Sequence, residues 1–127
     1  GWEPSVLIIG SKNVPAPGPG VSPYSVAKAG LTQLGRVAAL ELGAHGIRVN
    51  TIHPNAVFDT GIWDDETVAK RAANYGISSA EYRKRNVLGV EITAQNVASM
   101  IVALLGEGFL RTTGAQIPID GGNERVI

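Results

Sequence analysis

The order of apolar and polar positions in this chain predicts alternating strands and helices. Ser5 to Ser11 is a continuous apolar run, the pattern of a strand covered on both faces. A helix is expected from Pro23 to about Leu42, with Ser22 as its cap and Gly43 as its stop. A second apolar strand is expected from Ile47 to His53. Strand, helix and strand in this order predict a right-handed parallel crossover.

Shorter elements are expected in the rest of the chain. Together they predict an α/β fold with three parallel apolar strands, too few to cover the helices beside them. The elements are a loop from Pro54 to Trp63, a helix from Asp64 to Tyr75 stopped by Gly76, a short helix capped by Ser78 or Ser79, a helix from Ala94 to Leu105 capped by Thr93, a strand from Ala115 to Ile119, a turn at Asp120, Gly121 and Gly122, and a tail from Asn123 to Ile127.

The long helix has more apolar surface than one neighbour can bury. Its main stripe is expected to be Ala27, Leu31, Leu34 and Ala38, with further apolar residues at 37, 39 and 40. We therefore expect a sheet on one side and a neighbouring helix or subunit on another. Gly30 and Gly35 each cost about 1 kcal/mol relative to alanine inside a helix, which suggests that another backbone approaches closely there. In the helix from 94 to 105, the core positions are expected to be Val97, Ile101, Leu104 and Leu105.

Composition narrows the class of protein. The 127 residues suffice for one domain, and 44% apolar and 17% charged residues are typical of a globular chain. The formal charge is zero, so nothing favours nucleic acid or an anionic membrane as a partner. Cysteine is absent, which excludes disulfides and thiolate metal sites. No apolar run has the length of a membrane span and no secretory leader is visible, so a cytoplasmic location is expected.

Ser11, Tyr24 and Lys28 are the candidate chemical groups. Tyr24 and Lys28 are four residues apart on the expected helix, so they lie on the same face. Ser11 ends the first strand and can face both. A phenol has a reference pKa of about 10, and a nearby positive charge favours its ionised form. A phenol, an ammonium and a hydroxyl in this order predict acid/base chemistry.

Other polar residues are better explained without chemistry. His53 and His45 have no partner at metal-ligand spacing and are expected to be structural. Asp64, Asp65 and Glu66 fit the N-terminus of a helix, and the Asp120–Gly122 segment fits a turn better than a phosphate site. The proline- and glycine-rich loop from Lys12 to Pro23 is interpreted as a rigid wall beside the site.

In order along the chain, these motifs resemble the catalytic half of the short-chain dehydrogenase/reductase family. The serine of Ile8-Ile-Gly-Ser11 precedes Tyr24-Ser-Val-Ala-Lys28, the family's Tyr-x-x-x-Lys, and Gly46-Ile-Arg-Val-Asn50, Pro54 and Asp120-Gly-Gly122 follow. The resemblance implies the C-terminal half of a doubly wound, Rossmann-type parallel sheet. The whole chain, 1–127, is then a single partial domain that holds the catalytic residues and the substrate loop. The dinucleotide-binding N-terminal half, with its Gly-rich turn, is absent from the sequence.

The resemblance also implies residue roles. Tyr24 is the expected acid/base, Lys28 its activating cation and a ligand of the cofactor ribose, and Ser11 the partner of the substrate oxygen. The cofactor is NAD or NADP, and the residues expected to contact it are Tyr24, Lys28, Pro54, Asn55, Ala56 and Val57. Substrate contacts are expected from Ser11 and Trp63, with Tyr75, Tyr82 and Arg85 as further candidates.

Two departures from the family pattern leave questions open. Asn55 replaces a glycine, and asparagine tolerates positive φ better than most residues. The family's threonine falls at Asp59, with Thr60 one place late, so the residue that approaches the cofactor stays undecided. The segment from His53 to Trp63 and the ending from Asp120 to Ile127 resemble the dehydrogenase region of fused rhamnulose-1-phosphate aldolase/alcohol dehydrogenases. That resemblance implies a short hydroxyaldehyde such as lactaldehyde as substrate.

The sequence therefore predicts the catalytic half of an oxidoreductase that transfers hydride between a nicotinamide and a small alcohol or aldehyde. The alternatives are an inert fragment or oligomerisation remnant of a larger fused enzyme, and non-redox lyase or epimerase chemistry on the same scaffold. The expected partners are a small-molecule substrate, the missing N-terminal half and further copies of the chain, with no metal.

Overall fold

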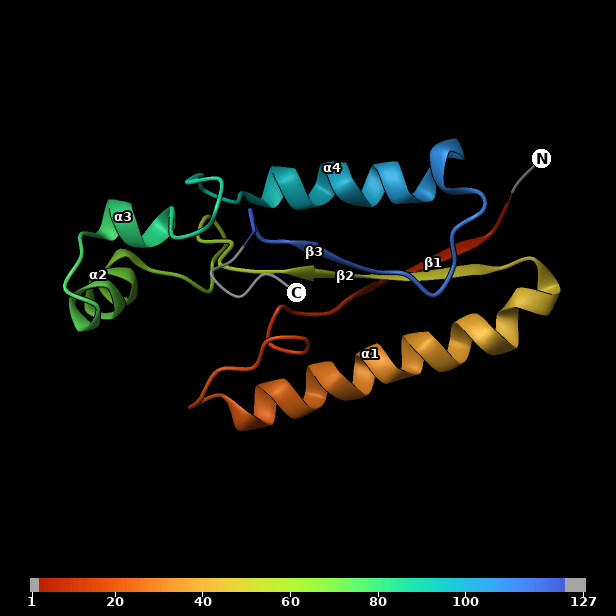
Figure 1. Cartoon of the computed structure of the whole chain (residues 1–127), viewed down its shortest axis with the longest axis horizontal. Coiled ribbons are helices and arrows are strands. Elements are labelled where there is room, and N and C mark those ends of the chain that lie inside the picture. The colour runs from red at the N-terminus through yellow and green to blue at the C-terminus, as the bar shows by residue number, and fades with distance from the viewer. Residues whose placement is uncertain (1–2, 123–127) are drawn as a thin grey trace.

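A computed structural model describes residues 3–122 and shows three layers (Figure 1). The central layer is a parallel sheet in the order β1 (Ser5–Ile9), β2 (Arg48–Pro54) and β3 (Gln116–Ile119). In Figure 1, α1 (Ser22–Leu42) covers one face and α4 (Ala94–Leu105) covers the other, while α2 (Asp65–Asn74) and α3 (Ser79–Arg83) lie beyond the carboxyl end of β2. The expected parallel α/β architecture is confirmed for the described residues.

The centre of the core is β2. Its residues from Arg48 to His53 are buried, as a parallel strand between two others and two helices requires. Ile52 packs with Leu104, Ile119 and Ile92, and Val97 and Ile101 of α4 pack against this cluster. Leu105, expected in the core, is 45% exposed instead, and Met100 packs against the cluster from α4.

The residues that begin and end α1 differ from the predicted ones by a few positions. Its N-cap is Val21, which makes no capping hydrogen bond through its side chain, so Ser22 is the first helical residue and not the cap. Gly43 keeps a right-handed conformation and continues into a 3-10 turn, Gly43–His45. The chain reverses at Gly46, whose φ of 71° suits glycine best, and Gly46 therefore stops this helical segment.

The face of α1 that meets the sheet is made of small and polar residues. Thr32, Gly35 and Ala39 are buried, so the expected stripe through Leu31 and Leu34 is not the sheet-facing one. A Cβ added to Gly35 would lie 3.0 Å from Thr51 Oγ1 and 3.1 Å from Ile8 Cγ1, so the close neighbours of Gly35 are side chains of the sheet and not the predicted backbone. At Gly30 nothing lies within 4 Å of such a Cβ, and the same expectation is wrong.

The outer face of α1 keeps the large apolar side chains. Val26 is 72% exposed, Leu34 59% and Leu40 83%. Within the described part of the chain no element covers this face. The sequence expectation of a second cover, from another helix or subunit, therefore remains a prediction.

The cap predicted for α4 is confirmed, Ser78 and not Ser79 caps α3, and α2 begins one residue after the predicted start, with Asp64 as its cap. The side chains of Asp64, Ser78 and Thr93 each accept a hydrogen bond from a backbone N–H in the first turn of α2, α3 and α4. Gly121 and Gly122 both have positive φ, which confirms the expected turn after β3. Residues 123–127 of the expected tail lie outside the described range. None of the helices within residues 3–122 combines the length and apolarity that crossing a membrane requires.

Candidate active site

A cavity of about 610 Å³ opens at the carboxyl end of the sheet, within the usual size range of small-molecule sites. In a parallel sheet the loops that follow the strands gather at this end. The cavity brings together eight of the site residues predicted from the sequence: Ser11, Tyr24, Lys28, Pro54, Asn55, Ala56, Val57 and Trp63.

Ser11 follows the carboxyl end of β1 and is held there by buried polar contacts. It is only 7% exposed, and its N–H donates to Nδ1 of His53 over 3.2 Å. Nε2 of His53 is 2.8 Å from Oε1 of Gln116, the first residue of β3, so one imidazole on β2 links β3 to the residue that follows the end of β1. A Cβ on Gly10 would come within 2.6 Å of that imidazole, and only glycine fits there. His53 is therefore a positioning residue, consistent with the structural role predicted for it.

Tyr24 and Lys28 project from the first two turns of α1 toward the same cavity. The Lys28 ammonium donates to the carbonyl of Ile9 over 3.0 Å and lies 5.9 Å from the Tyr24 ring centroid. This contact ties the start of α1 to the end of β1. The Tyr24 side chain is 48% exposed, which leaves its hydroxyl accessible to a ligand. The Ser11 hydroxyl accepts a hydrogen bond from the N–H of Asn13 over 3.2 Å.

The loop that follows β2 lies at the carboxyl end of the sheet and lines the cavity. The N–H of Asn55 donates to the carbonyl of Ile119, so Asn55 continues the pairing with β3. Positive φ occurs at the next residue, since Ala56 has a φ of 53° and is the one non-glycine residue of the described chain in that region. An L-residue there costs about 1–2 kcal/mol. The backbone change suggested by the replaced glycine thus falls on Ala56.

The open choice between Asp59 and Thr60 is decided by position. Thr60 lines the cavity, and its hydroxyl donates to the carbonyl of Val57 over 3.1 Å. Asp59 faces away, because its carboxylate accepts a hydrogen bond from the N–H of Ala94 at the start of α4. Thr60 is therefore the residue near any ligand.

Trp63 is the aromatic side chain of the substrate loop that reaches the cavity. Its ring meets the buried Phe58 edge-on, with centroids 4.8 Å apart. Tyr75, Tyr82 and Arg85 were further candidates for substrate contacts, and none of them lines the cavity. Tyr82 packs on Phe58 and Tyr75, and Arg85 lies over the Tyr75 ring at 4.1 Å.

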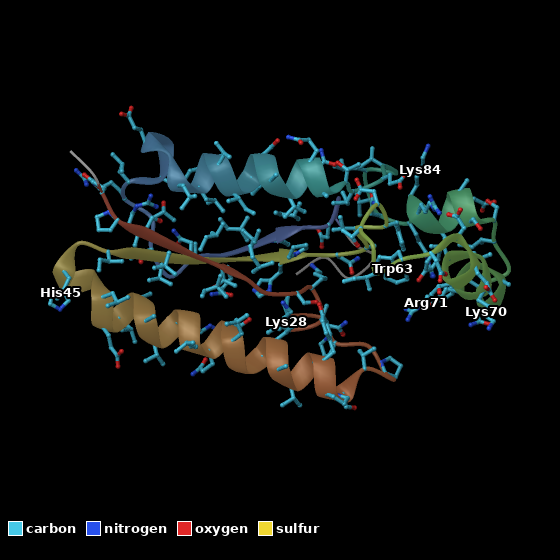
Figure 2. All side chains as sticks on the ribbon, turned by 180° about the vertical axis from the view of Figure 1, so that it is seen from behind. Lys28, His45, Trp63, Lys70, Arg71 and Lys84 are labelled. Carbon is cyan, nitrogen blue, oxygen red and sulfur yellow. The ribbon has the colours of Figure 1, made fainter. Side chains whose placement is uncertain are left out.

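Sequence reasoning missed Arg71. The Arg71 guanidinium lies 4.9 Å from the Trp63 ring centroid and lines the cavity. Figure 2 shows Arg71 and Trp63 next to each other, with Lys28 apart from them on the α1 side. Helical spacing could have indicated that Arg71 lies next to the packed face of α2. Arg71 is one turn from the buried Val68 and adjacent to the buried Ala72. It therefore sits at the border of the packed face of α2.

Sequence reasoning also missed a buried ion pair that involves the residue after Ser11. Lys12 is 3% exposed and pairs with Asp120, 6% exposed, with Nζ and Oδ2 2.7 Å apart. The other carboxylate oxygen of Asp120 accepts the N–H of Gly122. This buried ion pair joins the loops after β1 and β3. Both residues directly follow apolar strands, which was the only sequence signal of their meeting.

This arrangement suits proton transfer next to a bound carbonyl or alcohol. It offers an accessible phenol, a buried hydroxyl and an ammonium in one partly apolar cavity. The residues also fit the nicotinamide end of a dinucleotide, because Lys28 can donate to a ribose and no carboxylate lines the cavity to repel phosphate.

A family model described as "Enoyl-(Acyl carrier protein) reductase" matches residues 3–124. The uncharacterized oxidoreductase YuxG of Bacillus subtilis (strain 168) is 40% identical over 123 residues, which make up 93% of this chain and 18% of that protein. Human L-xylulose reductase is 35% identical over 104 residues, or 80% of this chain and 38% of that protein.

A solved structure of an NADPH-bound short chain oxidoreductase from Pseudomonas aeruginosa PAO1 superposes with a TM-score of 0.76 and 26% identity, covering 97% of this chain and 47% of that one. The chain thus spans less than half the length of these relatives.

Proposed function

The chain belongs to the short-chain dehydrogenase/reductase family, and on that premise we propose that it is the catalytic part of an NAD- or NADP-dependent oxidoreductase for a small alcohol or carbonyl compound. The observation that carries the proposal is the convergence of Ser11, Tyr24 and Lys28 on one cavity from β1 and α1. Relatives named as oxidoreductases, one of them solved with NADPH, support it.

In the proposed mechanism the Ser11 hydroxyl donates to the substrate oxygen and fixes its direction. The Tyr24 hydroxyl gives a proton to that oxygen during reduction and takes one back during oxidation. The Lys28 ammonium stabilises negative charge on the phenol oxygen. The nicotinamide, when bound, exchanges a hydride with the substrate carbon. Lys28, Ala56 and Val57 are the residues of this chain that would hold its ribose and amide.

Replacing Tyr24 with phenylalanine tests this role, because it removes only the hydroxyl. We expect nicotinamide turnover in the full-length protein to fall by about 100-fold or more. Tyr75→Phe is the matched control, since that tyrosine is also exposed but lies outside the cavity. Near-normal turnover by Tyr24→Phe, measured as nicotinamide absorbance, would refute the assignment.

The finer proposal is that the chain is the dehydrogenase region of an aldolase fusion. The chain covers only 18% of the Bacillus relative, which supports a long multidomain parent. Intact mass of the natural protein, with an assay for sugar-phosphate cleavage, tests it. A parent of ordinary dehydrogenase length without cleavage activity would exclude the fusion.

The alternative is that these 127 residues are inert by themselves. It is favoured by the absence from the sequence of a Gly-rich phosphate-binding turn. Titrating the isolated chain with NADH and NADPH distinguishes the two. Tight binding by the chain alone would exclude the inert reading.

A further inference from the structure

The two charged side chains that line the cavity differ in the contacts that they already make. Among residues 3–122, Lys28 and Arg71 are the charged residues that line it, and no carboxylate does. One of the three N–H donors of the Lys28 ammonium is used by the carbonyl of Ile9, and the proposed mechanism assigns the others to Tyr24 and the cofactor ribose. Within residues 3–122 the Arg71 guanidinium makes no hydrogen bond or ion pair, and its defined contact is the face of Trp63. The cavity therefore presents one uncommitted planar cation.

None of the four acidic residues on and just before α2 lines the cavity beside Arg71, and three of them are engaged elsewhere. Asp64 accepts from the N–H of Thr67, Asp65 pairs with Arg83 over 2.8 Å, and Asp59 accepts from the N–H of Ala94. Glu66, in the first turn of α2, does not line the cavity either.

Stacking on Trp63 restricts where the guanidinium can point. Trp63 is itself held by the buried Phe58 ring, so the contact places Arg71 against a defined surface. A stacked guanidinium keeps its N–H groups in plane, where they match the two oxygens of a carboxylate or phosphate. Arg71 of α2 lines the same cavity as Ser11, after β1, and Tyr24 of α1, so a ligand that fills the cavity can contact both groups at once.

We propose that Arg71 is a specificity residue that selects substrates carrying an anionic group, a carboxylate or a phosphate, in addition to the reacting carbon. The proposal rests on the proposed function, because it assumes that the reaction takes place at Ser11 and Tyr24. It differs from the neutral hydroxyaldehyde implied by the aldolase resemblance, which offers no partner for the guanidinium.

The test compares matched pairs of compounds on the full-length protein. 3-Hydroxybutyrate and its amide probe the carboxylate, while sorbitol 6-phosphate and sorbitol probe the phosphate. We expect the wild-type protein to prefer the anionic member of at least one pair. Arg71→Met is expected to lower that preference by about 10- to 100-fold, through KM and not kcat, because a charge-assisted contact is lost. Arg71→Lys keeps the positive charge but lacks the planar pair of N–H donors, and it is expected to recover only part of the preference.

Arg85→Met is the matched control, because Arg85 also stacks on an aromatic ring but lies outside the cavity. It is expected to leave the preference unchanged. Equal use of neutral and anionic members by the wild-type protein would overturn the proposal, as would an unchanged preference in Arg71→Met. A raised KM for NAD or NADP in Arg71→Met, with substrate preference intact, would assign the contact to a cofactor phosphate and also overturn it.

A binding readout separates this proposal from the catalytic one. Tryptophan fluorescence is titrated with inorganic phosphate and with 3-hydroxybutyrate, in the wild-type protein and in Arg71→Met. A saturable change that Arg71→Met abolishes and Tyr24→Phe retains supports the anion site even if no compound is turned over. Identical titrations in the wild-type protein and Arg71→Met would reject it, whatever the fate of the catalytic assignment.

Discussion

Two walls of the cavity are held by different forces. The strand-end wall contains Ser11, fixed by the buried His53, and is joined to the turn after β3 by the Lys12–Asp120 pair. The helix wall contains Trp63 and Arg71, held by ring contacts and by the partly exposed Arg83–Asp65 ion pair. Buried polar contacts are costly to break, while surface contacts contribute little each. The first wall is suited to fixed chemistry and the second to adjustable recognition.

The largest expected effect comes from breaking the strand-end wall at its ion pair. Asp120→Ala leaves the Lys12 ammonium buried without its partner, and we expect a loss of about 3–5 kcal/mol in the free energy of unfolding. Urea denaturation measures it. The double variant Lys12→Met/Asp120→Leu is expected to recover a large part, because no charge then remains buried. A single-variant loss below about 1 kcal/mol would show that this wall is held no more firmly than the other.

An intermediate effect is expected at Ala56, between the two walls. Ala56→Val puts a β-branched side chain at a φ of 53°, and we expect a loss of about 1–3 kcal/mol. Thermal unfolding measures it, with Val57→Ala as a neighbouring variant at ordinary φ. If Ala56→Val were as stable as the wild-type protein, the loop would adopt another backbone in solution.

The smallest effect is expected at the cap of the helix wall. The hydrogen bonds from Thr67 lower the pKa of Asp64 below its ordinary value of 3.8. Because the folded pKa is lowered, the charged cap stabilises α2 fully above about pH 3.8 and loses this effect as the pH falls through the lowered folded value.

The protection factors of the α2 amides, which compare their exchange rates with the intrinsic rate at each pH, are therefore expected to fall in acid, while the strands around His53 stay protected. Asp64→Asn keeps a capping oxygen without the charge and is expected to remove the pH dependence. Protection factors in α2 that did not change between pH 5 and pH 3, a window of about two units around the ordinary value, would show that the charge of the cap contributes nothing.

The fold was predictable where a local pattern was sufficient. Capping residues placed the starts of α2, α3 and α4, and continuous apolar runs placed all three strands. The errors fall on α1, where Leu34 looked like core and is exposed, while Thr32 and Gly35 meet the sheet. Hydrophobicity marks surface that needs covering, but it does not say which neighbour covers it.

The sequence by itself determined the strands, the helices and the order of Ser11, Tyr24 and Lys28, because strand burial, helix capping and helical spacing act over a few residues. Only the tertiary structure decided that Thr60 and not Asp59 faces the cavity, that Lys12 meets Asp120 and that Arg71 stacks on Trp63. Lys12 and Asp120 are far apart in the chain, and the Asp59, Thr60 and Arg71 orientations depend on how loops and helices pack. Such contacts exist only after the sheet has brought its strand ends together.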